Sequence, residues 1–265
     1  MRSLKQFGRF GYEQAMSCLF PVVIFASLAV TQILPLPLLP RYDWLLIICL
    51  LMQWLMVRSG LETRDELKVI TLFHLIGLAL ELFKVQMGSW SYPEESYFKL
   101  FGVPLYSGFM YASVASYLCQ AWRRFNVDLV KWPPFVIVVP LASAIYLNFF
   151  THHYWFDFRW WLSGLVIIVF WQSWVTYEVA GTRYRMPLVF SFILIGFFIW
   201  IAENIATFFG AWEYPNQTDA WSLVHLGKVS SWLLLVIVSF LIVATLKLVK
   251  GKSNNRVDIH AKTNM

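Results

Sequence analysis

The sequence predicts an all-α fold, a polytopic bundle of about eight transmembrane helices. Of its 265 residues, 59% are hydrophobic and only 14% are charged, whereas soluble domains carry about 25% charged residues. Eight apolar segments are long enough, at about 17–25 residues, to cross the hydrocarbon core of a bilayer. Lysine and arginine also gather in every second connecting segment, which is typical of membrane proteins with a fixed orientation.

The eight predicted spans follow one another along most of the chain. They are residues 16–38, 43–58, 67–86, 103–122, 133–150, 160–179, 187–209 and 226–248. The second is the shortest, and prolines fall mostly at span ends, where a missing N–H costs little. Together the spans predict a single transmembrane domain over residues 1–250, followed by a polar, disordered cytoplasmic tail at 251–265.

The distribution of basic residues predicts that both termini face the cytoplasm. With the N-terminus inside, the inner segments hold 16 of the 21 lysines and arginines. The outer segments hold only Arg41, Lys84, Lys99, Arg159 and Lys228. This bias follows the positive-inside rule for a multi-pass protein. Because topology accounts for the net charge of +6, we expect no nucleic-acid partner.

One motif occurs twice: a glutamate is followed seven residues later by Gly-(Ser/Ala)-Trp-x-Tyr-Pro. The copies begin at Glu81 and at Glu203, 122 residues later. Each glutamate lies in the outer third of a predicted span, where a charged side chain costs roughly 2.5–3.5 kcal/mol. The glycines fit as helix C-caps, and Tyr-Pro fits as an extended exit. Since an offset of four helices keeps the orientation, we expect a parallel repeat with halves at about 1–125 and 126–250.

The two glutamates, Glu81 and Glu203, are the candidate catalytic residues. Two acids in different surroundings can divide into proton donor and proton acceptor. Polar and aromatic side chains near the acids are candidates for substrate binding. They are His74, Lys84, Trp90, Tyr92, Asn204, Trp212, Tyr214, His225 and Lys228. The structural alternative is that Lys84 and Lys228 form ion pairs with the acids and hold the helices in register.

A metal site is only weakly indicated, at His152, His153 and Asp157. Adjacent histidines diverge on a helix, and zinc or iron sites usually need three or more ligands in a fixed frame. The alternative is a polar loop at the headgroup boundary. The three cysteines have no partner spacing, so neither a disulfide framework nor a zinc site is expected. We therefore predict no metal and no cofactor.

Two further patterns favour architecture over chemistry. Gly108, Ala112 and Ser116 place a small residue at every fourth position, which allows close packing between helices. Glu62 and Glu66 lie among basic residues between two predicted spans, and this charged stretch predicts a solvated inner loop.

Three stretches of the chain resemble a bacterial family of integral membrane proteins catalogued as domain of unknown function 817. They are residues 88–97 together with 101–113, residues 148–154, and residues 196–217, which contain Trp-Ile-Ala-Glu-Asn. The resemblance covers nearly the whole chain. It implies a membrane-helix fold and a bacterial source, hence the inner membrane, but no activity.

A weaker resemblance concerns function. Gly-x-Trp-x-Tyr loops followed by Gly102-Val103-Pro104 are similar to membrane carotenoid-type cyclases, whose membrane acids protonate a polyene. The cyclase pattern continues Pro-x-Glu-Glu, whereas this chain has Tyr106 and Ser107 at those two acidic positions.

Three functions are compatible with these residues. The first is an intramembrane acid/base enzyme on a lipid-soluble, isoprenoid-like substrate, in which aromatic faces stabilise a carbocation. The second is a proton-coupled small-molecule transporter, because buried acids also serve as proton relays. The third is a non-catalytic membrane module whose outer loops bind a partner. Membrane lipids are expected to contact the protein in each case.

Overall fold

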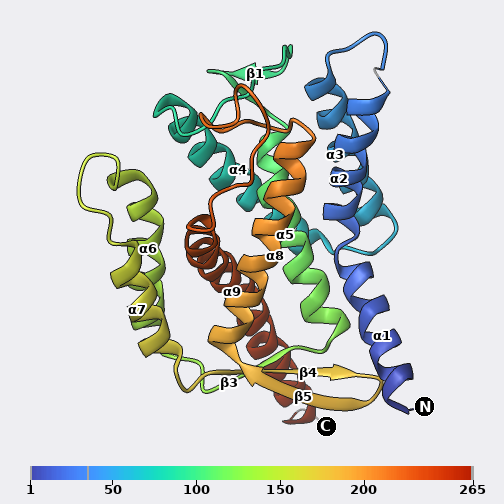
Figure 1. The fold of residues 1–265 in the computed structure, drawn as a ribbon. Helices are drawn as coiled ribbons and strands as arrows, with labels where there is room; N and C mark the ends of the chain where they lie inside the picture. Colours follow the sequence, from blue (N-terminus) through green and yellow to red (C-terminus); the bar gives the residue numbers. More distant parts are fainter. Residues whose placement is uncertain (1, 35, 264–265) are drawn as a thin grey trace.

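The computed structural model describes residues 2–34 and 36–263, which form nine helices and five short strands (Figure 1). The helices are α1 (Arg2–Ser17), α2 (Leu19–Ile33), α3 (Arg41–Arg58), α4 (Arg64–Gln86), α5 (Ser107–Arg124), α6 (Phe135–Thr151), α7 (Arg159–Phe170), α8 (Leu188–Phe208) and α9 (Lys228–Thr263). The strands are β1 (Lys99–Leu100), β2 (Val103–Pro104), β3 (Asp128–Val130), β4 (Trp174–Val179) and β5 (Thr182–Pro187). The fold is mostly helical, as predicted, but the strands were missed.

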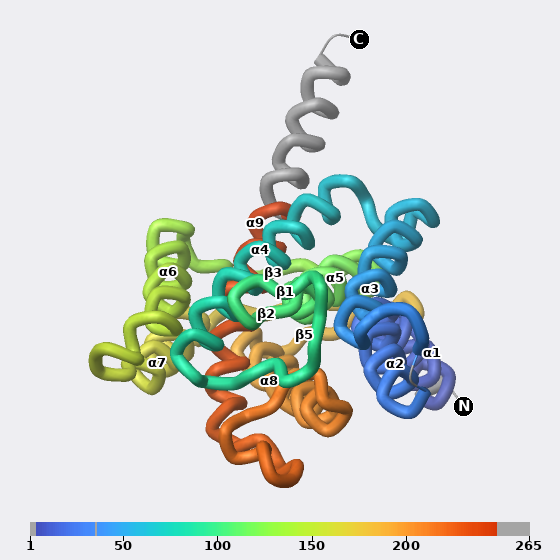
Figure 2. The backbone as a smooth tube through the Cα atoms, turned by 90° about the horizontal axis from the view of Figure 1, so that it is seen from above, coloured from blue at the N-terminus to red at the C-terminus, as the bar shows by residue number. Residues whose placement is uncertain are grey.

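Four helices, α4, α5, α8 and α9, form the centre of the bundle (Figures 1 and 2). Helices α1, α2 and α3 cover one side, and the α6–α7 hairpin stands on the other (Figure 2). Both ends of the chain lie at the end of the bundle that carries β3, β4 and β5, and the loops after α4 and α8 lie at the opposite end (Figure 1). The predicted cytoplasmic placement of the termini stays a prediction.

The number of candidate membrane spans in the described residues is smaller than the sequence predicted. Helices occupy all eight predicted segments, but in the described chain only α4, α8 and residues Lys228–Lys247 of α9 are long and apolar enough to cross a bilayer. The α1–α2 pair, bent by 67°, adds a fourth if it counts as one span. Helix α7 has 12 residues, so it is about 18 Å long and falls short of a ~30 Å hydrocarbon core. The structure thus confirms a mostly helical protein with three or four candidate spans in its described residues, and the count of eight stays a prediction.

The second half of the predicted span 160–179 is a strand, which hydropathy alone did not distinguish from a helix. Helix α7 ends at Phe170, and β4 pairs with β3 on one side and β5 on the other. The β4–β5 turn consists of Ala180 and Gly181, with φ of 49° and 76°. Positive φ at both central residues is typical of a type I′ hairpin, whose twist matches the flanking strands.

Helix α1 was not expected, because the first predicted span begins only at residue 16. Its exposed side includes Leu4 and Phe7, which are 77% and 75% exposed. Residues 251–265 were predicted as a disordered tail. The structure continues α9 to Thr263, and the side chains of this stretch lie outside the described residues, so the prediction is not tested.

Small residues allow α4 and α5 to pack closely, as the sequence indicated. Ala112 and Ser116 are fully buried. A Cβ at Gly108 would lie 2.7 Å from the His74 ring and 2.9 Å from the His74 carbonyl oxygen. At Gly77 a Cβ would lie 2.4 Å from the Tyr111 ring. Both glycines therefore set the distance between the two helices that carry one half of the site.

The sequence predicted a solvated inner loop between α3 and α4, and this prediction is wrong for its glutamates. Glu62 and Glu66 are each only 2% exposed. Glu62 accepts hydrogen bonds from Gln53 and Ser116. Glu66 accepts from the Lys247 ammonium at 2.7 Å and closes a capping box at the start of α4. These two clusters fill the bundle at the end opposite the motif loops and tie α3, α4, α5 and α9 together.

Gly108→Ala is expected to lower the free energy of unfolding by about 1–3 kcal/mol, because the new methyl group overpacks the α4–α5 contact. Thermal unfolding of the detergent-solubilised protein measures the change. The matched control is Gly164→Ala in α7, where a Cβ meets open space. The control is expected to be neutral or stabilising by about 0.5–1 kcal/mol. Equal effects of the two substitutions would contradict the packing argument.

Glu62 is expected to contribute more to stability on mild acidification, as the difference between the wild type and a Glu62→Gln variant. Burial raises the pKa of Glu62 above its usual value of 4.5, although the Ser116 and Gln53 hydrogen bonds oppose the shift. A raised folded-state pKa favours folding when the carboxyl is protonated, so stability is gained as pH falls through that value and is constant below the unfolded pKa. We expect this contribution of Glu62 to increase as the pH falls from neutral toward the unfolded-state value of about 4.5.

Chemical denaturation at several pH values measures this gain. The Glu62→Gln variant is expected to lose the pH dependence, whereas Glu95→Gln, at an exposed position, keeps it. A wild-type profile for Glu62→Gln would contradict the assignment to Glu62.

Candidate functional site

Both motif loops begin at a glycine in the left-handed conformation. Helix α4 is followed by Gly88 with φ of 67°, and α8 by Gly210 with φ of 65°. In each loop the N–H after the glycine returns to the carbonyl five residues earlier, at 3.0 Å and 2.9 Å. This pattern is a Schellman C-cap, in which glycine avoids the strain that a Cβ would cause. The predicted capping role of the glycines is confirmed.

The two loops pair with each other through their backbones. The Ser91 N–H donates to the Glu213 carbonyl, and the Glu213 N–H donates to the Ser91 carbonyl, both at 3.0 Å. These residues hold the same position in the two motif copies, 122 residues apart. The pairing joins the loops that follow α4 and α8, the two helices that carry the acids.

Glu81 lies near the C-terminal end of α4 and is 5% exposed. One carboxylate oxygen, Oε2, accepts from the Trp90 indole N–H and the Tyr92 hydroxyl, both at 2.7 Å. The other oxygen, Oε1, accepts from the Tyr111 hydroxyl at 2.7 Å. All three donors are neutral aromatic groups, and two come from the motif itself.

Glu203 has a matching environment in α8 and is 3% exposed. The Tyr214 hydroxyl donates to its Oε1, and the Trp232 indole N–H donates to its Oε2 at 2.7 Å. Tyr214 stands 11 residues after Glu203, as Tyr92 stands 11 residues after Glu81. Each motif tyrosine therefore turns back to the acid of its own copy.

The motif tyrosines are held as hydrogen-bond donors. Burial, and then the Glu81 carboxylate, raise the pKa of Tyr92 well above its ordinary value of 10. Burial and the Glu203 carboxylate do the same to the pKa of Tyr214. Both hydroxyls therefore stay protonated at neutral pH and orient the acids.

The two acids open into one cavity of about 160 Å³. Its walls include Trp90, Tyr92, Trp212 and Tyr214. The Trp90 and Tyr214 rings meet edge to face, with centroids 6.0 Å apart at 79°. The structure thus brings the two predicted catalytic residues and the four motif aromatics together.

Lys84 does not pair with Glu81, although both lie on one side of α4. Its ammonium contacts the Nε2 atoms of His153 at 2.8 Å and His152 at 3.3 Å. His152 Nδ1 lies 2.8 Å from the Asn148 carbonyl oxygen, which only accepts, so Nδ1 carries the hydrogen and Nε2 is free to accept from Lys84. Burial lowers the pKa of His152, which agrees with a neutral ring.

Lys228 at the start of α9 does not pair with Glu203. Its ammonium lies over the ring of Tyr214, 4.4 Å from the centroid, and over the ring of Trp90 at 5.1 Å. Within the described residues no ion pair joins either lysine to an acid. The ion-pair alternative that the sequence left open is therefore not formed.

Two of the predicted substrate-binding histidines lie outside the cavity. The His74 ring packs on Phe109 with centroids 4.5 Å apart, and its buried Nδ1 finds no partner among the described groups. His225 is exposed, and its Nδ1 accepts from the Gly227 N–H at 3.0 Å. Helical spacing placed His74 on the side of Glu81, but two turns separate it from the cavity.

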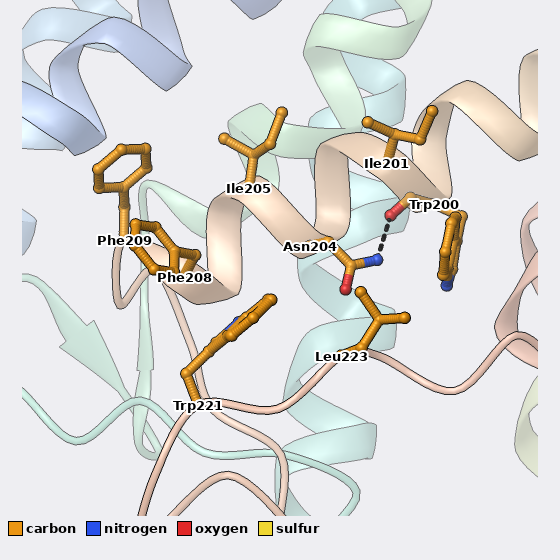
Figure 3. Close-up of a pocket in the computed structure, with 8 residues that line it drawn as sticks. All are labelled: Trp200, Ile201, Asn204, Ile205, Phe208, Phe209, Trp221 and Leu223. Atoms are coloured by element: carbon orange, nitrogen blue, oxygen red, sulfur yellow. Dashed lines mark hydrogen bonds between the residues drawn. The ribbon is translucent and has the colours of Figure 1, made fainter.

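Asn204, the neighbour of Glu203, lines a second, apolar pocket of about 360 Å³ (Figure 3). Its Nδ2 donates to the Trp200 carbonyl at 2.8 Å, and its Oδ1 accepts from the Val224 N–H at 2.9 Å. Adjacent residues of a helix face different directions, so Asn204 holds the loop before α9 and not the cavity.

The predicted metal candidates are engaged in other contacts. Asp157 pairs with Arg159 at 3.2 Å and accepts from Asn148 at 3.1 Å. The rings of His152 and His153 have centroids 4.2 Å apart and are tilted by 39°, and the Nε2 atoms of both contact the Lys84 ammonium. Within residues 2–34 and 36–263 no group of three or more potential ligands is suited to a metal ion.

Sequence reasoning missed Tyr111 and Trp232, which donate to Glu81 and Glu203. They lie on α5 and α9, 30 and 29 residues after their acids. Comparing the two segments at the motif offset would have revealed an aromatic donor at nearly equal spacing. Arg159 was also missed and lines the same cavity.

The arrangement can move protons at a bound molecule. Both carboxylates are oriented by hydrogen bonds, face one cavity and belong to different helices. A pair of this kind can donate a proton on one side and accept one on the other. The aromatic walls present π-faces, which can stabilise a positively charged centre.

Similarity to known proteins covers almost the whole chain. The family model described as "Protein of unknown function (DUF817)" matches residues 6–240. The "Uncharacterized protein YoaT" of Bacillus subtilis (strain 168) is 82% identical over 259 residues, which cover 98% of each chain. A crystal structure of a cross-linked MvINS trimer aligns with a TM-score of 0.48 and 11% identity, over 69% of this chain and 93% of that chain. The chain belongs to the DUF817 family, whose members include this Bacillus relative.

Proposed function

We propose that this protein is an intramembrane acid/base enzyme for a lipid-soluble, isoprenoid-like substrate. The observation that carries the proposal is that two buried carboxylates, from two candidate spans, open into one aromatic-walled cavity. Ionisable groups at such depth are costly, and their default interpretation is functional. The proposed chemistry needs no cofactor.

The unequal hydrogen bonding of the acids suggests their roles. Glu81 accepts three hydrogen bonds and Glu203 accepts two, and donors to a carboxylate favour its charged form. We therefore assign Glu81 as base and Glu203 as acid. Glu203 adds a proton to one substrate carbon, and Glu81 removes a proton from another. The product is an isomer of the substrate, and proton exchange through water at the cavity restores both acids.

The aromatic walls suit the cation that exists between the two proton transfers. Trp90, Tyr92, Trp212 and Tyr214 surround the acids. A desolvated π-face stabilises positive charge by roughly 0.5–2 kcal/mol. The Lys228 ammonium already lies over Trp90 and Tyr214. The faces left for a substrate cation are therefore those of Tyr92 and Trp212. An extended polyene or isoprenoid develops such a cation on protonation, which supports this substrate class.

A proton-coupled transporter uses the same acids, but it needs a polar path from both ends of the bundle. At the end opposite the cavity, Glu62 bonds with Gln53 and Ser116, and Glu66 pairs with Lys247. The aromatic walls of the cavity at the acids support an enzyme over a carrier. A non-catalytic module does not require a cavity at the acids.

We also infer that the two halves, about 1–125 and 126–250, are a parallel repeat. Three matched features support the inference: the glycine caps, the tyrosine-to-acid hydrogen bonds and the reciprocal pairing of Ser91 with Glu213. A residue pairing with its own equivalent is the geometry expected near a two-fold axis.

The bacterial inner membrane is the proposed location, with both termini cytoplasmic and membrane lipids as neighbours. The Bacillus relative supports the source. The shared end of the two termini, together with the excess of basic residues in the predicted inner segments, supports the orientation.

Glu81→Gln and Glu203→Gln are each expected to lower product formation by about 10²–10⁴-fold, because a positioned acid or base contributes that factor. Membrane lipids from cells that express each protein at equal level are separated by chromatography and analysed by mass spectrometry. The wild type is expected to yield a lipid with the mass of its precursor but a different retention time.

The matched control is Glu95→Gln, an exposed glutamate of the same loop, which is expected to give the wild-type lipid profile. Identical profiles for wild type and both cavity variants, with all proteins folded, would refute the enzyme for the lipids present.

A further inference from the structure

Three cationic side chains line the cavity: Lys84, Arg159 and Lys228. Lys84 is only 6% exposed. A buried ammonium is normally compensated by a carboxylate. In the described part of the chain, neither lysine forms such a pair, and only Arg159 has an acid, Asp157, beside it. Neither Glu81 nor Glu203 therefore contacts the positive charges of Lys84 and Lys228.

The hydrogen-bonding capacity of Lys84 is incompletely used. An ammonium has three N–H donors. Two of them are directed to His152 and His153, which hold the lysine in place through ring nitrogens. Both the Lys84 and the His152 side chains line the cavity, so the remaining donor is available to a bound group.

Lys228 stands between the two halves of the site. Its ammonium lies over the Tyr214 and Trp90 rings. These rings attract the positive charge but are not conventional hydrogen-bond acceptors, so the N–H groups remain able to bond to a ligand. Arg159 adds a planar fork that binds oxygen anions in bidentate fashion. Two lysines and one arginine, contributed by α4, α7 and α9, thus converge on one small space.

We propose that Lys84, Arg159 and Lys228 form a binding site for a phosphate group, within the cavity that also holds Glu81 and Glu203. The proposal rests on the proposed function, because it assigns this group to the head of the same substrate. A phosphate monoester carries about −1.5 to −2 charge and three acceptor oxygens, which fits three separated cations better than a single carboxylate does.

The size of the cavity limits what it holds. At about 160 Å³ it is close to the volume of an engineered cavity that binds benzene, so it accepts a head group and a few carbons but not a whole lipid. The head is fixed by the cations, the first carbons lie near the acids, and the remaining chain leaves the cavity. The acids then act at a fixed distance from the phosphate.

Binding to the purified full-length protein in detergent tests this site. The probes are farnesyl phosphate, the uncharged alcohol farnesol, and inorganic phosphate, each titrated with thermal unfolding as the readout. Lys84→Met and Lys228→Met are each expected to weaken farnesyl phosphate binding by about tenfold or more, the value of one charge-assisted hydrogen bond. Lys68→Met, on the same helix as Lys84 but 78% exposed at its side chain, is the matched control and is expected to bind as the wild type does.

The outcomes separate the sources of the phosphate and the two proposals. Lysine-dependent binding of farnesyl phosphate, stronger than that of inorganic phosphate, supports a lipid head group. Equal, lysine-dependent binding of both supports a site for a free phosphate. Farnesol binding as tightly as farnesyl phosphate, or unchanged binding in both folded lysine variants, overturns the site.

Glu81→Gln keeps the three cations and removes a negative charge from the cavity, so it is expected to bind farnesyl phosphate at least as tightly as the wild type does. Retained binding in this variant without any lipid product in wild-type cells would refute the enzyme but keep the phosphate site. A lipid product in wild-type cells without binding of farnesyl phosphate would support the enzyme and refute the phosphate site.

Discussion

The burial of two carboxylates by neutral aromatic donors is the constraint on which the site depends. A carboxylate inside a helix bundle needs hydrogen bonds for both oxygens, since unpaired polar groups are costly away from water. A lysine would satisfy it but would also occupy the acid and remove it from chemistry. Tryptophan and tyrosine supply an N–H or O–H on an apolar body. Trp90 and Tyr92 on Glu81, and Tyr214 and Trp232 on Glu203, therefore stabilise the acids and leave them available.

This constraint explains the motif. A donor that follows its acid in sequence must reverse direction within a few residues, and the left-handed glycines Gly88 and Gly210 provide the reversal. The hydroxyl donor then falls 11 residues after the acid in both copies. The two returning loops lie side by side and pair at Ser91 and Glu213, which closes the cavity from one end. The glycine caps, the aromatic donors and the loop pairing therefore act together: they supply the buried carboxylates with hydrogen bonds in place of water.

The sequence predicted the acids, the glycine caps and the aromatic residues of the cavity, because they recur in one short pattern. It did not predict the lysine partners, because a helix projection gives the direction of a side chain and not its reach. Lys84 bends to His152 and His153, which the α6–α7 hairpin brings alongside α4. Likewise, hydropathy marked eight apolar segments but did not fix where each helix ends. Residues Trp174–Val179, inside one predicted span, pair as a strand. Such outcomes depend on tertiary contacts that no local pattern contains.

The differences between the two copies matter more for function than their likeness. An arrangement in which both acids had identical donors would give them equal proton affinity and no direction for proton transfer. Here α5 and α9 each supply one donor, Tyr111 and Trp232. The motif Trp90 adds another donor to Glu81, whereas among the described residues its counterpart Trp212 forms no hydrogen bond with Glu203. Lys228 lies against Tyr214 and Trp90, and Lys84 is held by the histidines, so the cations are also placed unequally. Matched loops thus position two acids at one cavity, and unmatched neighbours make one of them the better base.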